Sequence, residues 1–557
     1  MIALIVVISM AVLLAGYRLY GGYLARLLKL DDTAVTPACK IDDGVDFVPA
    51  PAKLLLGQHF SAIAAAGPIV GPILAAIWFG WLPALLWILL GAIFIGGPHD
   101  FLALAASVRN KAASIGEIVK QRMSRTSHLL FLVFLWLALV YVIIAFTDIT
   151  AQTFRTVAQD QAYGPAVAGT SLVYLGLGLL MGVCLYKLKM NLWLATGIFL
   201  PLVLASVWLS TRMPAPWTAA LMAVPVKGWE VGLLAYCFAA SLIPMWLLLQ
   251  PRGYLGGWFL YLTIITGLLG ALFSGFAAQY PALNLAGLQS LANYKYLFPI
   301  LFITVACGAC SGFHGVVSSG TTSKQICRES DTRTVGYGAM LLEALVAVLA
   351  IATLMILPKG DALLKGDPNL IYANGLARYL GLVGIDFSLA LTFALLAFST
   401  FVYDTLDVCT RLARYIMQEL LGIKGAGGAA LATLITLVPP LVFLLLAREK
   451  AYLVAWPIFG TSNQLMASLI LLVLAVWLKG TGRSPWAAIV PMVFMMVVTL
   501  ASLVVQIVPF LRLLAGHPGA PDTVVSGVCG MVLLVLAAWL VAESVRSLRS
   551  AGAVARG

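Results

Sequence analysis

The sequence predicts an all-α polytopic membrane protein of about 15 transmembrane helices, which include two five-helix halves arranged as an inverted repeat. Three observations predict this fold. Of the 557 residues, 62% are hydrophobic and only 10% are charged, with a mean hydropathy of +1.01, whereas soluble domains carry about 25% charged residues. The run GPIVGP (residues 67–72) interrupts a long apolar stretch. Basic residues gather in alternate loops.

Apolar segments follow one another along the whole chain, separated by loops too short to hold a soluble domain. The first segment lacks a basic start and a small-residue cleavage site, so we interpret it as a membrane span and not as a signal peptide. The predicted spans cover residues 1–17, 54–78, 82–107, 127–151, 165–186, 191–211, 229–249, 256–278, 296–318, 336–357, 384–410, 427–447, 452–478, 486–511 and 523–545.

The positions of the basic residues predict the orientation of these spans. If each span crosses the bilayer once, most of the 34 Lys and Arg residues fall in loops on one side, including Arg109 and Lys111 in one loop and Arg411 and Arg414 in another. Loops rich in Lys and Arg face the cytoplasm. We therefore expect the N-terminus outside and the C-terminus inside, and we ascribe the net charge of +12 to orientation and not to binding of nucleic acid.

Two proline interruptions suggest how the repeat is organised. GPIVGP lies in the second span, and Pro244 lies in the seventh span within SLIPMW (241–246). These spans are five apart and run in opposite directions, as expected for an inverted repeat. The predicted division is an N-terminal span and cytoplasmic loop (1–53), two five-helix halves (54–212 and 229–420) and four additional spans (427–557).

The interruption at Gly67, Pro68 and Gly71 is a candidate substrate site. In hydrocarbon, a broken helix is tolerated only where it is buried in protein or lines a cavity. The helix that starts after the break points its positive dipole end into that cavity, which favours a carboxylate. The alternative is a kinked helix whose Gly67 and Gly71 pack tightly on a neighbour.

Polar residues near the two interruptions complete the candidate substrate site. Ionisable and polar groups inside spans are costly, so they are functional candidates. The alternative for each is a packing role. We expect a substrate-lining role for Gln58, His59, Ser61 and His314, and for Tyr236, Ser241 and Trp246 around Pro244.

Five further residues are candidates for ion coupling or gating: His99, Asp100, Glu343, Asp404 and Asp407. Each has a structural alternative. His99 with Asp100 could anchor a helix end. Glu343 could pair with Arg333 or Lys324 at a gate. Asp404 and Asp407 share a helix face with Arg411 and Arg414, so they could form an ion-pair ladder instead of a proton relay.

Hydroxyl groups cluster at Ser318, Ser319, Thr321 and Thr322. Hydroxyl and carbonyl oxygens suit Na⁺, a hard cation, so a bound Na⁺ is the one ligand besides substrate that we expect. The alternative is hydrogen bonding of these hydroxyls to the preceding helical turn. Cys307 and Cys310 form a single CxxC pair among eight cysteines, which does not predict a zinc site.

Five long motifs resemble the carbon starvation protein A (CstA) family: GQHFSAIAAAGPIVGPILAA (57–76), DFLALAASVRNKAASIGEI (100–118), SGFHGVVSSGTTSKQI (311–326), GYGAMLLEALVAVLA (336–350) and WPIFGTSNQLMA (456–467). The resemblance implies a bacterial inner-membrane uptake system for peptides, or for pyruvate in some members, that serves carbon starvation. It also implies membership of the amino acid–polyamine–organocation superfamily, with its LeuT-like repeat.

The LeuT-like pattern assigns roles to particular spans. Its first and sixth core helices are unwound around the substrate, which corresponds here to Gly67–Pro72 and to Ser241–Trp246. Its sodium site lies between the first and eighth core helices, so Ser318, Ser319, Thr321 and Thr322 would face the second span.

These inferences predict a secondary active transporter that works by alternating access and imports short peptides or small carboxylates, coupled to Na⁺ or protons. No GxxxxGK[ST] motif indicates ATP-driven transport. Two other classes stay open: an intramembrane metal or redox enzyme that uses His59, His99, Asp100 and His314, and a passive channel. No HExxH-type pair supports the former.

Overall fold

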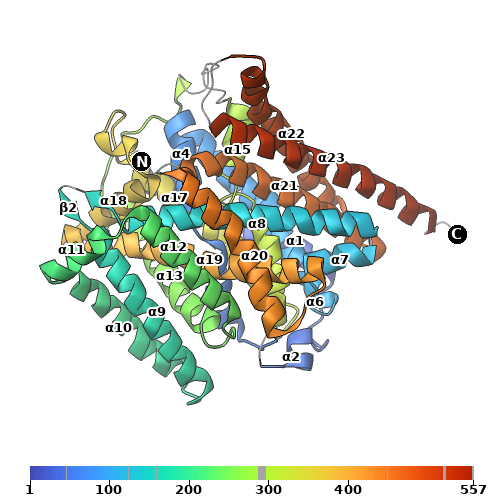
Figure 1. The fold of residues 1–557 in the computed structure, drawn as a ribbon, viewed down its shortest axis with the longest axis horizontal. Helices are drawn as coiled ribbons and strands as arrows, with labels where there is room; N and C mark the ends of the chain where they lie inside the picture. Colours follow the sequence, from blue (N-terminus) through green and yellow to red (C-terminus); the bar gives the residue numbers. More distant parts are fainter. Residues whose placement is uncertain are drawn as a thin grey trace.

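The computed structural model describes residues 1–44, 47–122, 124–158, 160–285, 296–447, 450–517 and 522–554. Figure 1 shows an almost entirely helical molecule. Its α-helices are α1 (Ile2–Leu28), α2 (Pro37–Ile41), α3 (Ala52–Ile63), α4 (Gly67–Phe79), α5 (Trp81–Gly91), α6 (Gly97–Arg109), α7 (Ile115–Arg122), α8 (Arg125–Thr153), α9 (Gly164–Tyr186), α10 (Leu192–Ser210), α11 (Ala215–Ala223), α12 (Val226–Leu242), α13 (Leu249–Phe273), α15 (Leu297–Thr304), α16 (Gly312–Gly320), α17 (Ala339–Met355), α18 (Pro368–Gly381), α19 (Phe387–Leu421), α20 (Gly425–Leu446), α21 (Ala451–Gly480), α22 (Trp486–Leu514) and α23 (Asp522–Val554).

Short irregular segments accompany these helices. Two are π-helical, η1 (Ala92–Gly96) and η3 (Arg333–Gly338), and two are 3₁₀-helical, η2 (Thr322–Lys324) and η4 (Ala362–Lys365). Strands β1 (Val157–Ala158) and β2 (Gln161–Ala162) pair antiparallel in a small hairpin.

The length and composition of the helices confirm a multi-pass membrane protein. Within the described residues, 11 helices are long and apolar enough to cross a bilayer, or up to 13 if each bent pair is one span. The predicted ninth span falls on the short helices α15 and α16, and the last on α23, whose apolar part is Gly527–Trp539. The count of about 15 spans therefore stays a prediction.

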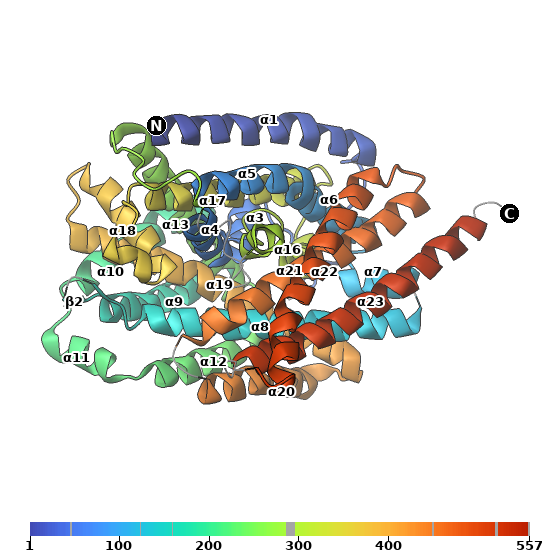
Figure 2. The same ribbon diagram turned by 90° about the horizontal axis from the view of Figure 1, so that it is seen from above.

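The interrupted helices lie in the interior of the molecule. Figure 2 shows α3, α4 and α16 between α1 and α5 on one side and α8 and α12 on the other. The apolar faces of α10 and α20 remain largely exposed. Only 33% of the apolar 18-residue stretch of each helix is buried, whereas 94% of the corresponding stretch of α21 is buried. Exposed apolar faces are what lipid contact requires.

The predicted break in the second span is present. Helices α3 and α4 form a bent pair with an angle of 46°, and residues 64–66 separate them. Pro68 lies in the first turn of α4, where its missing N–H has no helical partner. The Thr405 hydroxyl donates to the Ala62 carbonyl at 2.9 Å. This carbonyl at the break is thus satisfied by protein, as hydrocarbon surroundings demand.

The predicted break at 241–246 is wrong. Helix α12 ends at Leu242 and α13 begins at Leu249, so these residues join two helices and do not interrupt one. Ile243, at φ −71° and ψ 140°, has already left the helix, because a residue before proline disfavours the helical conformation.

The second interrupted span is residues 297–320, where α15 ends at Thr304 and α16 begins at Gly312. Asn463 on α21 stabilises this break: its Oδ1 accepts hydrogen bonds from the Phe313 N–H at 3.0 Å and from the Ser311 hydroxyl at 3.1 Å. On the other side of the break, Gln464 donates to the Phe302 carbonyl. Both interruptions are therefore built into the fold.

The two interruptions touch each other. A Cβ atom added at Gly71 would lie 2.3 Å from the Thr304 carbonyl oxygen, and one at Gly67 would lie 2.3 Å from Cys307 Sγ. These glycines thus allow α4 to pack directly on the end of α15. This close packing is the alternative that the sequence left open, and it exists together with the break.

Candidate functional site

A narrow, largely enclosed cavity of about 10 Å³, with room for about one water molecule, lies where α3, α13, α19 and the segment after α16 meet. Residues separated by hundreds of positions in sequence face it together. Six of the predicted residues line it: Gln58, His59, Thr321, Thr322, Asp404 and Asp407. Ala62, Leu249, Gly253 and Val408 form the rest of its wall.

The α3 side of the cavity presents unsatisfied polar atoms. His59 Nδ1 lies 2.8 Å from the Thr322 hydroxyl oxygen. His59 Nε2 and Gln58 Oε1 are buried, and neither has a hydrogen-bond partner in the described part of the chain. Buried polar groups are ordinarily paired, so orphaned atoms beside a cavity are what a polar ligand would satisfy.

Arg252 pairs with Asp404 and Asp407, the two carboxylates that line this cavity, and itself lines a neighbouring pocket; it was not among the residues predicted from the sequence. Its guanidinium is 2% exposed and lies between two carboxylates, with Nε 3.3 Å from Asp404 Oδ1 and Nη1 bonded to Asp407 Oδ2. The Tyr236 hydroxyl donates to Asp407 at 2.7 Å, and the Ser61 hydroxyl donates to Asp404. Tyr174, Tyr236 and Tyr403 hold their rings 5.1–5.7 Å from the guanidinium. We call this group the Arg252 cluster.

Asp404 and Asp407 form their ion pairs with Arg252, which does not support the ladder with Arg411 and Arg414 that was the alternative to a proton relay. Arg411 donates to the Ala240 and Ile243 carbonyls, and Arg414 donates to the Ser241 carbonyl at 2.7 Å. Both guanidinium groups therefore bind the last carbonyls of α12, which have no partner within the helix.

A second buried cluster joins α6, α16 and α17. Asp100 accepts contacts from two imidazoles, His99 Nδ1 at 2.7 Å and His314 Nδ1 at 2.9 Å. His314 Nε2 lies 3.1 Å from Glu343 Oε2, although the alignment is too poor for a hydrogen bond. All four side chains are fully buried. We call this group the histidine cluster.

Glu343 does not pair with Arg333 or Lys324, so that predicted alternative is wrong. Arg333 donates to the Tyr17 carbonyl at 2.8 Å and stacks on the Tyr17 ring. The Lys324 ammonium lies over the rings of Phe47 and Tyr415. Both Glu343 carboxylate oxygens lack a hydrogen-bond partner among the described residues.

Two of the four clustered hydroxyls bond to the preceding helical turn, as the alternative to Na⁺ binding predicted. Ser319 donates to the Gly315 carbonyl at 2.8 Å, and Thr321 donates to the Val317 carbonyl at 3.0 Å, so both bond to the preceding turn. Ser318 Oγ is buried and has no partner in the described residues. The parts of the chain that the structure describes hold no group of three His, Cys, Asp or Glu residues able to bind a metal ion.

Several predicted site residues lie away from the cavity. Gly67, Pro68 and Gly71 are buried in α4, where the two glycines face α15. Ser241 shares a hydrogen bond of 3.0 Å with Thr433 on α20. Trp246 lines a different, open pocket with Tyr186 and Lys187. The sequence placed Ser241 and Trp246 beside the cavity only because it misassigned the break at Pro244.

Comparison with known proteins decides the family. The family described as "Carbon starvation protein CstA" matches residues 1–365 and 361–502. The chain belongs to the CstA family. Three CstA-family relatives are the peptide transporters CstA of Campylobacter jejuni and of Escherichia coli K12, each 31% identical, and the pyruvate/proton symporter BtsT of E. coli K12, 30% identical. The alignments cover 91%, 89% and 89% of this chain and 80% of each relative.

Among solved structures, a mutant of the manganese transporter of Eremococcus coleocola aligns with 91% of this CstA-family chain and 99% of its own, with a TM-score of 0.46 and 15% identity.

Proposed function

We propose that this chain is a secondary active transporter of the bacterial inner membrane that imports short peptides by alternating access, with pyruvate-like acids as the competing substrate class. The observation that carries the proposal is the cavity between the interrupted α3–α4 pair, α13, α19 and the segment after α16. Relatives of the chain are named as peptide transporters and as a pyruvate/proton symporter, and their names suggest both substrate classes.

The charges around the cavity favour a zwitterion. Asp404 and Asp407 can receive the ammonium group of a peptide, while His59 and Gln58 offer polar atoms to the rest of it. Pyruvate carries only a carboxylate, which the two aspartates would repel unless Arg252 turned toward it. We therefore place peptides first.

Helix packing supports an inverted repeat, with boundaries that differ from those expected from sequence. Each interrupted span is followed by a helix that contains a π-helical segment, η1 before α6 and η3 before α17. Helix α8 packs on α19, α12 on α20, α13 on α3 and α21 on α16. We propose LeuT-like halves that run from α3 to α13 and from α15 to α21, with α9 and α10 outside the repeat. The N-terminus outside remains our proposed orientation.

The two clusters receive different proposed roles. The Arg252 cluster would close one side of the cavity as a gate, because Ser61 on α3, Arg252 on α13 and Asp404 on α19 meet there. The histidine cluster would carry the coupling proton, because imidazole groups can exchange protons near neutral pH and burial makes a carboxyl group easier to protonate. Ser318 and Thr322 offer hydroxyls for Na⁺ as the competing coupling ion.

Uptake into proteoliposomes tests this proposal. Labelled di- and tripeptides and labelled pyruvate would each be supplied with a proton gradient, a Na⁺ gradient or neither. We expect peptide accumulation above equilibrium with the proton gradient only. Accumulation of pyruvate alone would reassign the substrate, and accumulation with Na⁺ alone would reassign the ion. Flux that never saturates and ignores both gradients would indicate a channel and contradict the proposal.

A further inference from the structure

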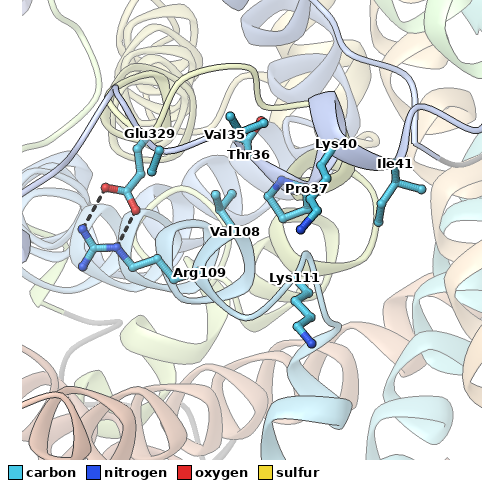
Figure 3. A pocket seen from close by; sticks show the side chains of 10 residues that line it. Val35, Thr36, Pro37, Lys40, Ile41, Val108, Arg109, Lys111 and Glu329 are labelled. Atoms are coloured by element: carbon cyan, nitrogen blue, oxygen red, sulfur yellow. Dashed lines mark hydrogen bonds and ion pairs between the residues drawn. The ribbon is translucent and has the colours of Figure 1, made fainter.

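A second pocket lies in the loops at the end of α6, outside the central cavity. It has a volume of about 600 Å³ and is formed by three segments: residues 34–41, the end of α6 with the turn after it, and Glu329. Figure 3 shows Arg109 and Glu329 joined at one end of this pocket and Lys40 and Lys111 near the other. No part of the proposed transport mechanism uses it.

The pocket holds more positive than negative charge. Arg109 binds both oxygens of Glu329, with Nη2 2.8 Å from Oε2, and also donates to the Lys29 carbonyl at 3.0 Å. Lys40 and Lys111 are exposed, and neither has an ion-pair or hydrogen-bond partner for its ammonium group within the described residues. Three cations therefore face one carboxylate.

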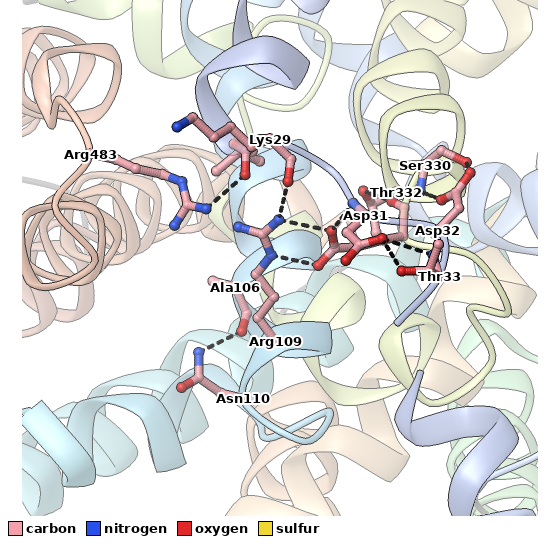
Figure 4. A network of polar contacts seen from close by, with 12 residues as sticks. Lys29, Asp31, Asp32, Thr33, Ala106, Arg109, Asn110, Ser330, Thr332 and Arg483 are labelled. Carbon is pink, nitrogen blue, oxygen red and sulfur yellow. Dashed lines mark hydrogen bonds and ion pairs between the residues drawn. The ribbon is translucent and has the colours of Figure 1, made fainter. Parts of the chain in front are cut away.

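Two acidic residues close to the pocket, Asp31 and Asp32, accept hydrogen bonds from their neighbours (Figure 4). The hydrogen bonds from Thr33 and, to a smaller extent, the charge of Arg109 lower the pKa of Asp31. Asp31 accepts hydrogen bonds from the Thr33 N–H at 2.9 Å and from the Thr33 hydroxyl, and Asp32 accepts from Ser330 at 2.7 Å. Arg483 lies on the other side of Arg109, and both its burial and the Arg109 guanidinium lower its pKa. Arg109 is therefore balanced by Glu329 and Asp31, and the exposed ammonium groups of Lys40 and Lys111 are the pocket's available cations.

The backbone holds Lys111 in an unfavourable conformation. Lys111 (φ 60°) and Ala112 (φ 54°) are consecutive left-handed residues without glycine, at a cost of roughly 1–2 kcal/mol per residue. Two hydrogen bonds stabilise the turn. The Ala112 N–H donates to the Ser107 carbonyl at 2.8 Å, and the Ser107 hydroxyl donates to the Ala113 carbonyl at 2.6 Å. Strain that the surroundings maintain is typical of ligand sites.

We propose that this pocket binds a phosphate group through Lys40 and Lys111. Lysine ammonium groups bind phosphate as point charges, while Arg109 stays paired with Glu329 at the other end of the pocket. The phosphate can belong to a soluble phosphate ester or to the headgroup of an anionic phospholipid. The Ile115 N–H, beyond the strained turn, bonds to Ser319 Oγ on α16 at 3.1 Å. Occupation of the pocket would therefore stiffen a connection to the candidate transport site.

The test uses the full chain in phosphatidylcholine nanodiscs, with thermal unfolding as the readout. One arm titrates inorganic phosphate at constant ionic strength against chloride. The other arm replaces part of the lipid by phosphatidylglycerol without added phosphate. The variants are K40Q/K111Q and, as a matched control, K189Q, because Lys189 is also an exposed left-handed lysine (φ 51°) but lies outside the pocket.

We expect phosphate to raise the unfolding midpoint of the wild type and K189Q, with affinity about tenfold weaker in K40Q/K111Q. A lysine-dependent rise only with phosphatidylglycerol would assign the phosphate to a lipid headgroup. An equal response of wild type and K40Q/K111Q in both arms, including no response, would overturn the proposal. Equal midpoints of the two proteins without either ligand would show that the double variant is folded.

Discussion

The Arg252 cluster and the histidine cluster each bury two carboxylates, but they balance that charge differently. In the first, a guanidinium that is always protonated lies between Asp404 and Asp407. In the second, the ion-pair partners of Asp100 and Glu343 within the described part of the chain are the imidazoles of His99 and His314. A permanent cation fixes the charge of its cluster, whereas imidazoles supply charge only when they bind protons. The first cluster therefore carries a fixed cation, whereas the charge of the second depends on which of its groups hold protons. Substitutions can break this contrast, and we order them by the expected loss of unfolding free energy.

Arg252→Ala should have the largest effect. It would leave two buried carboxylates without their cation, a loss of about 3–5 kcal/mol. Thermal unfolding in detergent measures this loss. The control is Arg212→Ala, because Arg212 is exposed and stacks on Trp208. An equal loss in the two variants would contradict the role of Arg252 as the fixed cation of its cluster.

Gly71→Leu should disturb the contact between the two interrupted spans, because α4 and α15 could no longer touch. The added Cβ would meet the Thr304 carbonyl oxygen at 2.3 Å, and overpacking of this kind costs about 1–3 kcal/mol. Gly176→Leu is the control, since nothing lies within 4 Å of a Cβ at Gly176. We expect uptake to be lost in the first variant and kept in the second. Normal uptake by Gly71→Leu would separate the contact from function.

His59→Ala tests the cavity that the Arg252 cluster bounds. It removes one hydrogen bond to Thr322, worth about 1 kcal/mol of stability, and we expect the KM for peptide to rise about tenfold. His517→Ala, in an exposed loop, should change neither quantity. An unchanged KM in His59→Ala would assign His59 to packing alone.

Glu343→Gln should have the smallest effect on stability, because neither carboxylate oxygen makes a hydrogen bond in the described residues. It should nevertheless abolish accumulation driven by a proton gradient, since an amide cannot carry the proton. Exchange of labelled for unlabelled peptide should persist, because exchange needs no net proton movement. Gradient-driven accumulation at the wild-type level would be incompatible with a titrating histidine cluster.

The sequence predicted what local chemistry determines. Glycine and proline at 67–72 located the first break within a few residues, and the apolar segments located the helices. Six cavity residues followed from their polarity inside apolar spans. At Pro244 the same reasoning failed, because a proline marks the end of a helix as readily as a break within one.

Long-range packing accounts for what the sequence did not predict. The break at 305–311 contains no proline, and its freed backbone is satisfied by Asn463 and Gln464, about 150 residues further along the chain. Arg252 was missed because it lies in QPRG (250–253), between two predicted spans. Only the structure shows that Asp404 and Asp407 on α19 face it. In both cases the decisive partner comes from a distant helix.

The bonds made by Asn463 and Gln464 have a mechanical consequence. Helix α21 forms hydrogen bonds with the chain on both sides of the break. It bonds to Phe302 before residues 305–311, to Ser311 at their end and to Phe313 after them. A hinge motion between α15 and α16 would have to break these hydrogen bonds. We therefore expect α15, α16 and α21 to move as one rigid body. The bend at residues 64–66 has no such clamp on both flanks among the hydrogen bonds of the described residues. A movement of α3 relative to α15, α16 and α21 is therefore the less costly way to open the cavity.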